Sequence, residues 1–300
     1  MAPPKMAVFG VPSAAGARGP GVERAAFALR EAGLLTALAR HARVVNLSDL
    51  SLFPWRDDPG HPKARNAPIA ACAARAAGDE MARALEAGFT LVIGGDCSLL
   101  PGTAGGVRQA LGRDVGVVHV DANADLNTPE TTPSGQLDGM ALALALGRGV
   151  PELAGAVCRP PAVRPEHATL VGYRELDPGE VGPARELALA LSAEQVRERG
   201  APGAAAAALA AIRNEDGPVL VHFDVDVLDP EAMPVKDALT PGRGLAWDEA
   251  EALLVALVRS PRVVALELCE FNPARDEDGR AARHLVELLE RGVAARAAVA

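Results

Sequence analysis

The chain has 300 residues, of which 49% are apolar and 23% charged, and its formal net charge is −9 at pH 7. This length and composition allow a soluble globular protein to bury a large core. The 30 basic residues form no run, whereas a nucleic-acid surface needs clustered Lys and Arg, so the expected partner is a small molecule and not nucleic acid.

Predicted strands and helices alternate along the chain, beginning with a strand at 6–11 and a helix at 21–32. This alternation is typical of β-α-β units and predicts an α/β fold with a mostly parallel sheet and helices on both faces. We expect one domain over residues 1–300. The further predicted strands are 44–47, 90–93, 115–120, 169–171, 219–223 and 263–268. The further predicted helices are 68–87, 99–111, 139–146, 204–213, 247–258 and 281–291, and the Pro- and Gly-rich stretch 51–66 predicts an irregular excursion.

Neither the N-terminus nor the cysteines indicate export. The opening MAPPKMAVFGVP matches neither a signal-peptide h-region nor a membrane span. Four cysteines, at 72, 97, 158 and 269, lack C-x-x-C spacing, so we expect free thiols. We therefore predict a cytoplasmic protein with no membrane partner.

Polar clusters follow five of the predicted strands, at the point where each strand ends. They are GGDCS at 94–98, DANAD at 121–125, YRELDPGE at 173–180, DVD at 224–226 and EFNP at 270–273. Ligands of open parallel sheets bind at the carboxyl ends of the strands, so these clusters predict one shared site.

Four aspartates in these clusters indicate a metal site. Asp121, Asp125, Asp224 and Asp226 would repel one another severely without compensating cations. A single D-x-D motif is more often a turn or a helix cap. Because D-x-x-x-D, D-x-D and GGDC come together here, we favour divalent metals, which can supply hydroxide at neutral pH.

The motifs also carry a family resemblance. GGDCS, DANADLNTPETTPSGQLDGM at 121–140, YRELDPGE, FDVDVLDP at 223–230 and EFNP resemble, in order and spacing, the arginase or ureohydrolase family. The match begins at the early GARGPGVERAAFALREAGL and covers nearly the whole chain. It implies a three-layer α/β/α fold, a homotrimer or homohexamer, and hydrolysis of a guanidino compound at two divalent metal ions, manganese in the family.

Within that family the chain is most similar to arginase, which implies a pocket for an amino acid with a guanidino group. Asp177 and Glu180 stand where arginase receives the α-amino group, and Glu270 stands where a carboxylate pairs with the guanidinium, a suitable bidentate partner. Residues matching the α-carboxylate site are Asn127, Ser134 and Gln136, the last replacing an asparagine. The candidate catalytic residues are Asp125, Asp138 and Glu270.

Three positions depart from the family pattern. Cys97 and Asn123 replace two metal-binding histidines, and Asp138 replaces a histidine that shuttles protons. A Cys97 thiolate would favour zinc or iron over manganese, and the amide oxygen of Asn123 is a weak donor. Cys97 could instead be a small buried residue, and Asp138 only a helix cap.

The resemblance therefore implies two unequal metal sites. The first would use Cys97, Asp121, Asp125 and Asp224; the second, which we expect to bind more weakly, would use Asp121, Asp224 and Asp226, with Asn123 marginal.

Two histidines precede metal aspartates by two residues on predicted strands. His119 and His222 should point to the same side as Asp121 and Asp224. Two residues of strand span about 6.6 Å, so we expect a hydrogen bond to a metal ligand, or simple core packing, and not coordination.

Together these features predict a metal-dependent hydrolase. It would cleave the guanidino group of L-arginine, or of an N-modified arginine such as N-hydroxy-arginine, and release urea or hydroxyurea. A better leaving nitrogen needs less help from a general acid, which would suit the missing shuttle histidine. The alternatives are a catalytically impaired pseudoenzyme and a different metal-dependent reaction on a similar amino acid, such as cyclisation.

Overall fold

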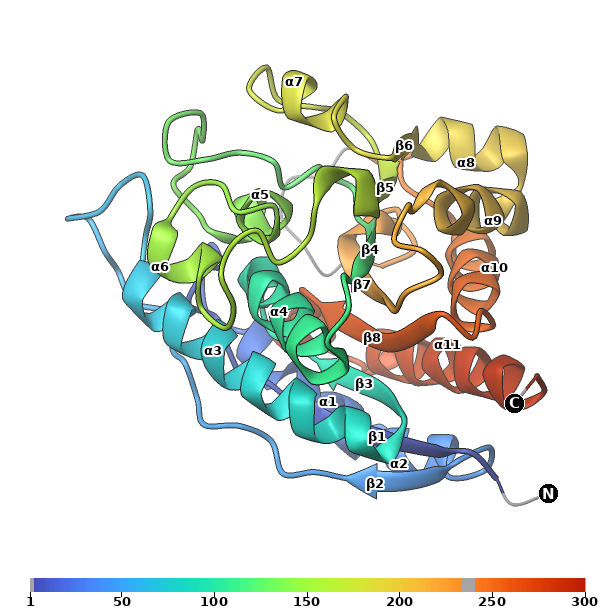
Figure 1. Cartoon of the computed structure of the whole chain (residues 1–300). Helices are drawn as coiled ribbons and strands as arrows, with labels where there is room; N and C mark the ends of the chain where they lie inside the picture. Colours follow the sequence, from blue (N-terminus) through green and yellow to red (C-terminus); the bar gives the residue numbers. More distant parts are fainter. Residues whose placement is uncertain (1–2, 234–240, 300) are drawn as a thin grey trace.

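The central sheet is parallel throughout in the computed structural model, which describes residues 3–233 and 241–299. Within that part of the chain it has eight strands in the order β2-β1-β3-β8-β7-β4-β5-β6 (Figure 1). The strands are β1 Lys5–Gly10, β2 Arg43–Asn46, β3 Phe89–Ile93, β4 Gly116–Val120, β5 Ala168–Tyr173, β6 Leu189–Ser192, β7 Val219–Asp224 and β8 Val263–Cys269.

Helices cover both faces of the sheet and bury two separate apolar cores. One core contains side chains of α1 Ala25–Glu31, α2 Leu34–Leu38, α8 Ala193–Arg199, α9 Ala201–Ala211, α10 Trp247–Val258 and α11 Arg280–Ala297. The other contains side chains of α3 Ala67–Ala84, α4 Leu100–Leu111, α5 Ala141–Ala145 and α7 Val181–Ala184. The short helix α6 Pro151–Ala154 packs near α3. This arrangement confirms the three-layer α/β/α prediction.

The inner strands are buried on both faces, which explains their nearly continuous apolar sequences. His119 in β4 and His222 in β7 are polar exceptions at full burial. The helices α3 and α4 approach each other closely: a Cβ on Gly102 in α4 would lie only 1.9 Å from the carbonyl oxygen of Ala74 in α3. A glycine is therefore required at this helix crossing.

All seven predicted strands and all seven predicted helices are present, with ends shifted by a few residues, and 51–66 is irregular as expected. The strand β6 and the short helices α2, α6, α7 and α8 were not predicted. The β6 sequence lies in the alanine- and leucine-rich run ELALALSAEQ, whose composition suits a helix better than an edge strand.

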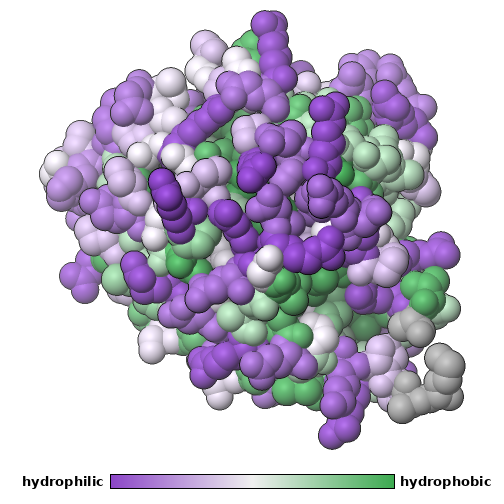
Figure 2. All heavy atoms as spheres, in the orientation of Figure 1, coloured by the Kyte–Doolittle hydropathy of each residue, from purple (hydrophilic) through white to green (hydrophobic). Residues whose placement is uncertain are grey.

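The surface is largely polar in the view of Figure 2, where hydrophilic side chains surround smaller apolar areas. Across the described ranges, each helix is too short or too polar to cross a bilayer.

Candidate active site

The site lies at the carboxyl edge of the sheet, where loops from neighbouring strands converge. Cys97 opens a short 3-10 helix after β3, Asp121 follows β4, Asp224 ends β7 and Glu270 follows β8. Since β7 pairs with both β4 and β8, residues distant in sequence become neighbours here. The predicted convergence of these strand ends is confirmed.

Cys97, Asp121 and Asp224 form a buried cluster of possible metal ligands. Their donor atoms all lie within 4.8 Å of one another, and the Cys97 thiol donates to Asp224 Oδ2 at 3.3 Å. A second group with the same spacing contains His119, Asp121 and His222. Carboxylate, imidazole and sulfur atoms at this spacing are a suitable donor set for a divalent transition metal.

Asn123 and Asp226 lie beside this cluster and hold each other in place. The Asn123 side-chain amide donates to Asp226 Oδ2 at 3.1 Å, and its backbone N–H donates to Asp121 Oδ1 at 2.7 Å. Asp226 Oδ1 in turn accepts a hydrogen bond from the Ala122 backbone at 3.2 Å. Asn123 thus orients the carboxylates of Asp121 and Asp226.

The His119 ring reaches the carboxylates directly. Its Nε2 lies 3.1 Å from Asp121 Oδ2 and 3.4 Å from Asp125 Oδ2, and within the described residues neither ring nitrogen has a hydrogen-bond partner. The side chains lean along the strand, so their tips are closer than the backbone rise of about 6.6 Å suggests. Burial lowers the pKa of His119 well below its usual range, and the neighbouring His222 lowers it further. The imidazole is therefore neutral and able to bind a metal.

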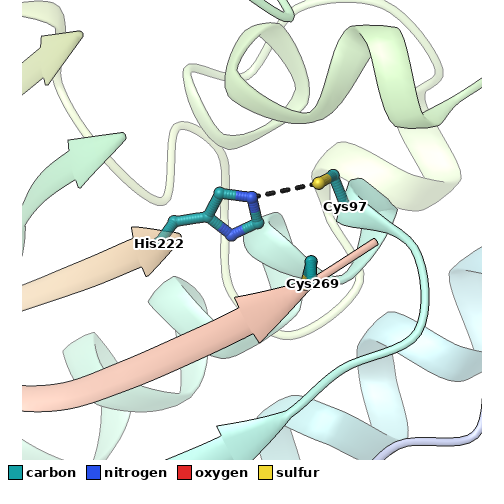
Figure 3. A group of neighbouring side chains, drawn as sticks. All are labelled: Cys97, His222 and Cys269. Carbon is teal, nitrogen blue, oxygen red and sulfur yellow. Dashed lines mark hydrogen bonds between the residues drawn. The ribbon is translucent and has the colours of Figure 1, made fainter. Parts of the chain in front are cut away.

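His222 contacts a different set of residues. Its Nδ1 lies 2.7 Å from Glu267 Oε2 and its Nε2 lies 3.2 Å from Cys97 Sγ, while Cys269 completes a group within 4.8 Å (Figure 3). Sequence reasoning missed Glu267 and Cys269. Period-two alternation in β8 places both on the same side of the strand, and pairing with β7 sets Glu267 beside His222. The contact between His222 and Glu267 follows only from the strand order.

A cavity of about 680 Å³ opens next to these donors. All eight predicted catalytic and substrate-binding residues line it: Asp125, Asn127, Ser134, Gln136, Asp138, Asp177, Glu180 and Glu270. Asn123 lines it too, whereas the other described ligand candidates, Cys97, Asp121, Asp224 and Asp226, are not among its lining residues. The predicted set therefore divides into a pocket wall and a buried cluster next to it.

Hydrogen bonds within the pocket wall tie two loops together. Glu180 Oε1 accepts from the Leu126 backbone at 3.0 Å and Oε2 accepts from the Asp177 backbone at 2.9 Å. Burial raises the pKa of Glu180, although these backbone hydrogen bonds oppose the shift. Asn127 donates to Asp177 Oδ2 at 2.9 Å. Glu180 thus acts as a loop brace, and the exposed Asp177 is better placed to meet a ligand.

The remaining part of the wall contains Ser134, Gln136, Asp138 and Glu270. Ser134 Oγ accepts from the Gln136 backbone at 3.2 Å, and Asp138 Oδ1 accepts from the Gly139 backbone at 2.7 Å. Glu270 Oε1 accepts from the Cys97 backbone at 3.1 Å, which links the pocket wall to the buried cluster.

Two site residues have a left-handed backbone. Asp125 has a φ of 52° and Glu270 a φ of 67°. For residues other than glycine this conformation costs on the order of 1–3 kcal/mol and persists where the surrounding structure enforces it. Such strain is common at functional sites, and here it occurs at two residues that line the cavity.

The fold and the site define an α/β protein with a buried group of candidate metal ligands next to an acidic cavity. Residues 4–293 match the sequence model of the Arginase family, and the chain belongs to this family. Its members are metal-dependent amidinohydrolases that act on guanidino groups, which makes this protein an enzyme of that class.

Individual relatives agree with this assignment. The chain is 32% identical to the arginase of Bacillus caldovelox over 289 residues, which is 95% of this chain and 96% of that protein. The structure of Entamoeba histolytica arginase in complex with L-ornithine matches with a TM-score of 0.86 at 27% identity, over 97% of this chain and 99% of that one. The proclavaminate amidino hydrolase of Streptomyces clavuligerus shares the fold, with a TM-score of 0.75 at 21% identity over 100% of this chain and 94% of that one.

Proposed function

We propose that the protein hydrolyses the guanidino group of L-arginine, or of an N-modified arginine such as N-hydroxy-arginine, and releases urea or hydroxyurea. The observation that carries this proposal is that Glu270 connects the pocket with the buried donor cluster. Its carboxylate lines the pocket and also accepts a hydrogen bond from the backbone N–H of Cys97, a member of that cluster. A guanidinium bound by Glu270 would therefore lie next to the metal donors.

The described residues fit divalent metal ions. Cys97, Asp121, Asp125 and Asp224 would hold the first, and Asp121, Asp224 and Asp226 the second and weaker one, with Asn123 as a marginal donor. Manganese is our expectation from the family, although the Cys97 sulfur favours a softer ion. When bound, such ions lower the pKa of water and so supply hydroxide for attack on the guanidino carbon.

The pocket wall supports an amino-acid substrate. Glu270 has two carboxylate oxygens for bidentate recognition of a planar guanidinium. Asp177 would bind the α-amino group, within a frame that Glu180 and Asn127 keep in place. The α-carboxylate would be bound by Asn127, Ser134 and Gln136. The L-ornithine complex of the Entamoeba histolytica relative is consistent with such a ligand.

Asp138 is the proposed proton donor to the leaving nitrogen. It lines the cavity and is largely buried. The bond that breaks joins the guanidino carbon to the side-chain nitrogen of the amino acid, so Asp138 would protonate that nitrogen, and an N-hydroxy group on a terminal guanidino nitrogen would stay with the released hydroxyurea. N-modified arginines are included among the substrates because the chain departs from the arginase pattern at Cys97, Asn123 and Asp138.

The test is urea and hydroxyurea release from L-arginine and N-hydroxy-arginine by protein loaded with manganese, compared with a Glu270→Gln variant. We expect release with at least one substrate and a large loss of kcat/KM in the variant. Binding without release would indicate the pseudoenzyme, and a product without urea or hydroxyurea would indicate another reaction such as cyclisation.

We further propose that residues 1–300 act as one domain, a view supported by the continuous sheet across the described ranges. Assembly into a homotrimer or homohexamer and a cytoplasmic location remain predictions, which size-exclusion chromatography with light scattering and cell fractionation can test.

A further inference from the structure

Three soft donors meet in the layer between the sheet and the helices α3, α4 and α5. Figure 3 shows His222 at the end of β7 pointing to Cys97, with Cys269 at the end of β8 beside them. We propose that Cys97, His222 and Cys269 form a binding site for a thiophilic divalent ion of the zinc class. This site shares Cys97 with the first metal position of the proposed function, but its metal binding can be measured without the hydrolysis reaction.

The distances between the donors suit such an ion. The two Sγ atoms and the imidazole nitrogen lie within 4.8 Å of one another, and His222 Nε2 is 3.2 Å from Cys97 Sγ. In a tetrahedral zinc site, a sulfur and a nitrogen ligand are about 3.5 Å apart. The Cys97–His222 pair is thus already close to the separation found in a zinc site, and a small adjustment of the donors would complete the site. Asp224 Oδ2, 3.3 Å from Cys97 Sγ, offers an oxygen as fourth donor.

Glu267 orients the imidazole for binding. Its carboxylate lies 2.7 Å from His222 Nδ1, so Nδ1 carries the proton and Nε2 presents its lone pair toward Cys97. A carboxylate on the far nitrogen of a metal-binding histidine is a common arrangement, because it fixes the ring and raises its basicity. Here the parallel pairing of β7 with β8 supplies it, with His222 beside Glu267 and Asp224 beside Cys269.

The local backbone also makes room for the second thiol. A Cβ on Gly94, at the end of β3, would lie 2.6 Å from Cys269 Sγ. Any larger residue at position 94 would push this thiol out of the group, so the glycine keeps Cys269 within reach of Cys97.

A catalytic thiol explains the arrangement less well. The contacts of Cys97 with His222 and Glu267 resemble those of a cysteine nucleophile with its base. However, Cys97 is 1% exposed and does not line the cavity. A nucleophile needs access to its substrate. A second buried thiol in the same group also has no purpose in that chemistry.

The test uses the full-length, reduced, chelator-treated protein and Co²⁺ as a probe, because thiolate ligands give cobalt a charge-transfer absorption in the near ultraviolet. We expect this absorption in the wild type, a decrease to about half in Cys269→Ser, and its survival in Cys158→Ser, a half-exposed thiol outside the group. Glu267→Gln should keep the absorption but weaken Co²⁺ binding by about 10–100-fold.

A second measurement needs no variant: X-ray absorption spectroscopy of the zinc-loaded wild type should show two sulfur neighbours at about 2.3 Å. One sulfur neighbour, or an unchanged absorption in Cys269→Ser, would leave Cys97 as the sole sulfur ligand and overturn the proposal. Rapid alkylation of Cys97 in the folded protein, or a Cys97–Cys269 disulfide in the protein as isolated, would overturn it as well.

The variant Asp226→Asn separates this inference from the proposed function. It removes a ligand of the second catalytic metal but none of the three soft donors, so urea release should fall while the cobalt absorption persists. Wild-type protein that shows the absorption but hydrolyses no guanidino compound would refute the proposed function alone.

Discussion

His119 and His222 stack face to face across the pairing of β4 with β7, with ring centroids 4.7 Å apart and ring planes only 5° apart. Both rings are fully buried. Glu267 engages one of them, whereas within the described residues the other has carboxylate oxygens nearby but no hydrogen bond to either nitrogen. Substitution of the two histidines should therefore change the stability of the metal-free protein in opposite directions.

For His119→Phe, we expect the metal-free protein to be at least as stable as the wild type. The change removes two buried nitrogens that lack hydrogen bonds, which reduce the free energy of unfolding by about 1–3 kcal/mol. The same variant should gain less stability from added metal, since it lacks a donor near Asp121 and Asp125. Urea unfolding with chelator and with Mn²⁺ measures both effects. His222→Phe is the matched control and should destabilise the metal-free protein by about 1–3 kcal/mol, because it leaves buried Glu267 without its partner.

The metal-free protein should also lose stability in acid through His119. The pKa of this group is lower in the folded state than its usual value of 6.5, so the unfolded chain binds the extra proton. The contribution of neutral His119 to the free energy of unfolding is present above pH 6.5. It is lost as the pH falls below that value, by at most about 1.4 kcal/mol per pH unit. Unfolding of chelated wild type and His119→Phe between about pH 7 and 5 should show a steeper decline in the wild type. Parallel curves would show that His119 does not titrate on unfolding.

Metal should raise the melting temperature of the wild type, because the clustered aspartates repel one another without it. An ion present at about 100 times its Kd stabilises the folded state by about 2.7 kcal/mol. Thermal melts before and after treatment with a strong chelator test this expectation. Identical melts, after elemental analysis has confirmed metal in the untreated sample, would contradict the presence of a metal centre.

Restoring the two metal-binding histidines of the family should require a third change, at His222. Cys97→His with Asn123→His supplies the usual imidazoles, but Cys97 Sγ already lies 3.2 Å from His222 Nε2, so a larger ring at 97 needs that space. We expect the pair of changes to destabilise the fold. Adding His222→Ala should relieve the crowding, although Glu267 then loses its hydrogen-bond partner and stability is recovered only in part. The triple variant should bind manganese toward two ions per chain and favour unmodified arginine. Metal counts and urea release on both substrates measure the outcome.

Substrate selection should depend on the two ends of the pocket in different ways. The affinity for arginine should be higher than that for agmatine, which lacks the α-carboxylate. The double variant Ser134→Ala with Gln136→Ala should reduce this difference in affinity. Asp177→Asn should lower kcat/KM for both compounds by about tenfold, because both carry the amino group that it binds. Glu175→Gln, an exposed change in the same wall, is the control and should have little effect. Equal affinity for agmatine in the wild type would contradict the assigned carboxylate site.

Much of this architecture could be predicted from local patterns, because buried parallel strands and amphipathic helices leave clear signals in sequence. The strand ends that carry Asp121, Asp224 and Glu270 followed from the same patterns. The contacts of His222 with Glu267 and Cys97 could not be predicted in this way. They depend on which strands pair and in what register, and nothing within one strand specifies its neighbour. The edge strand β6 was missed since its alanine-rich sequence favours a helix locally and only tertiary pairing makes it a strand.

The row formed by His119, His222 and Glu267 exists in a single alignment of three strands. A slip of one residue in β4 or β8 would turn a polar side chain to the opposite core and separate the donors. Metal uptake at the proposed sites would therefore require correct pairing of β4, β7 and β8. An ion bound during folding would stabilise only chains with that pairing, and so would select the correct register of the sheet.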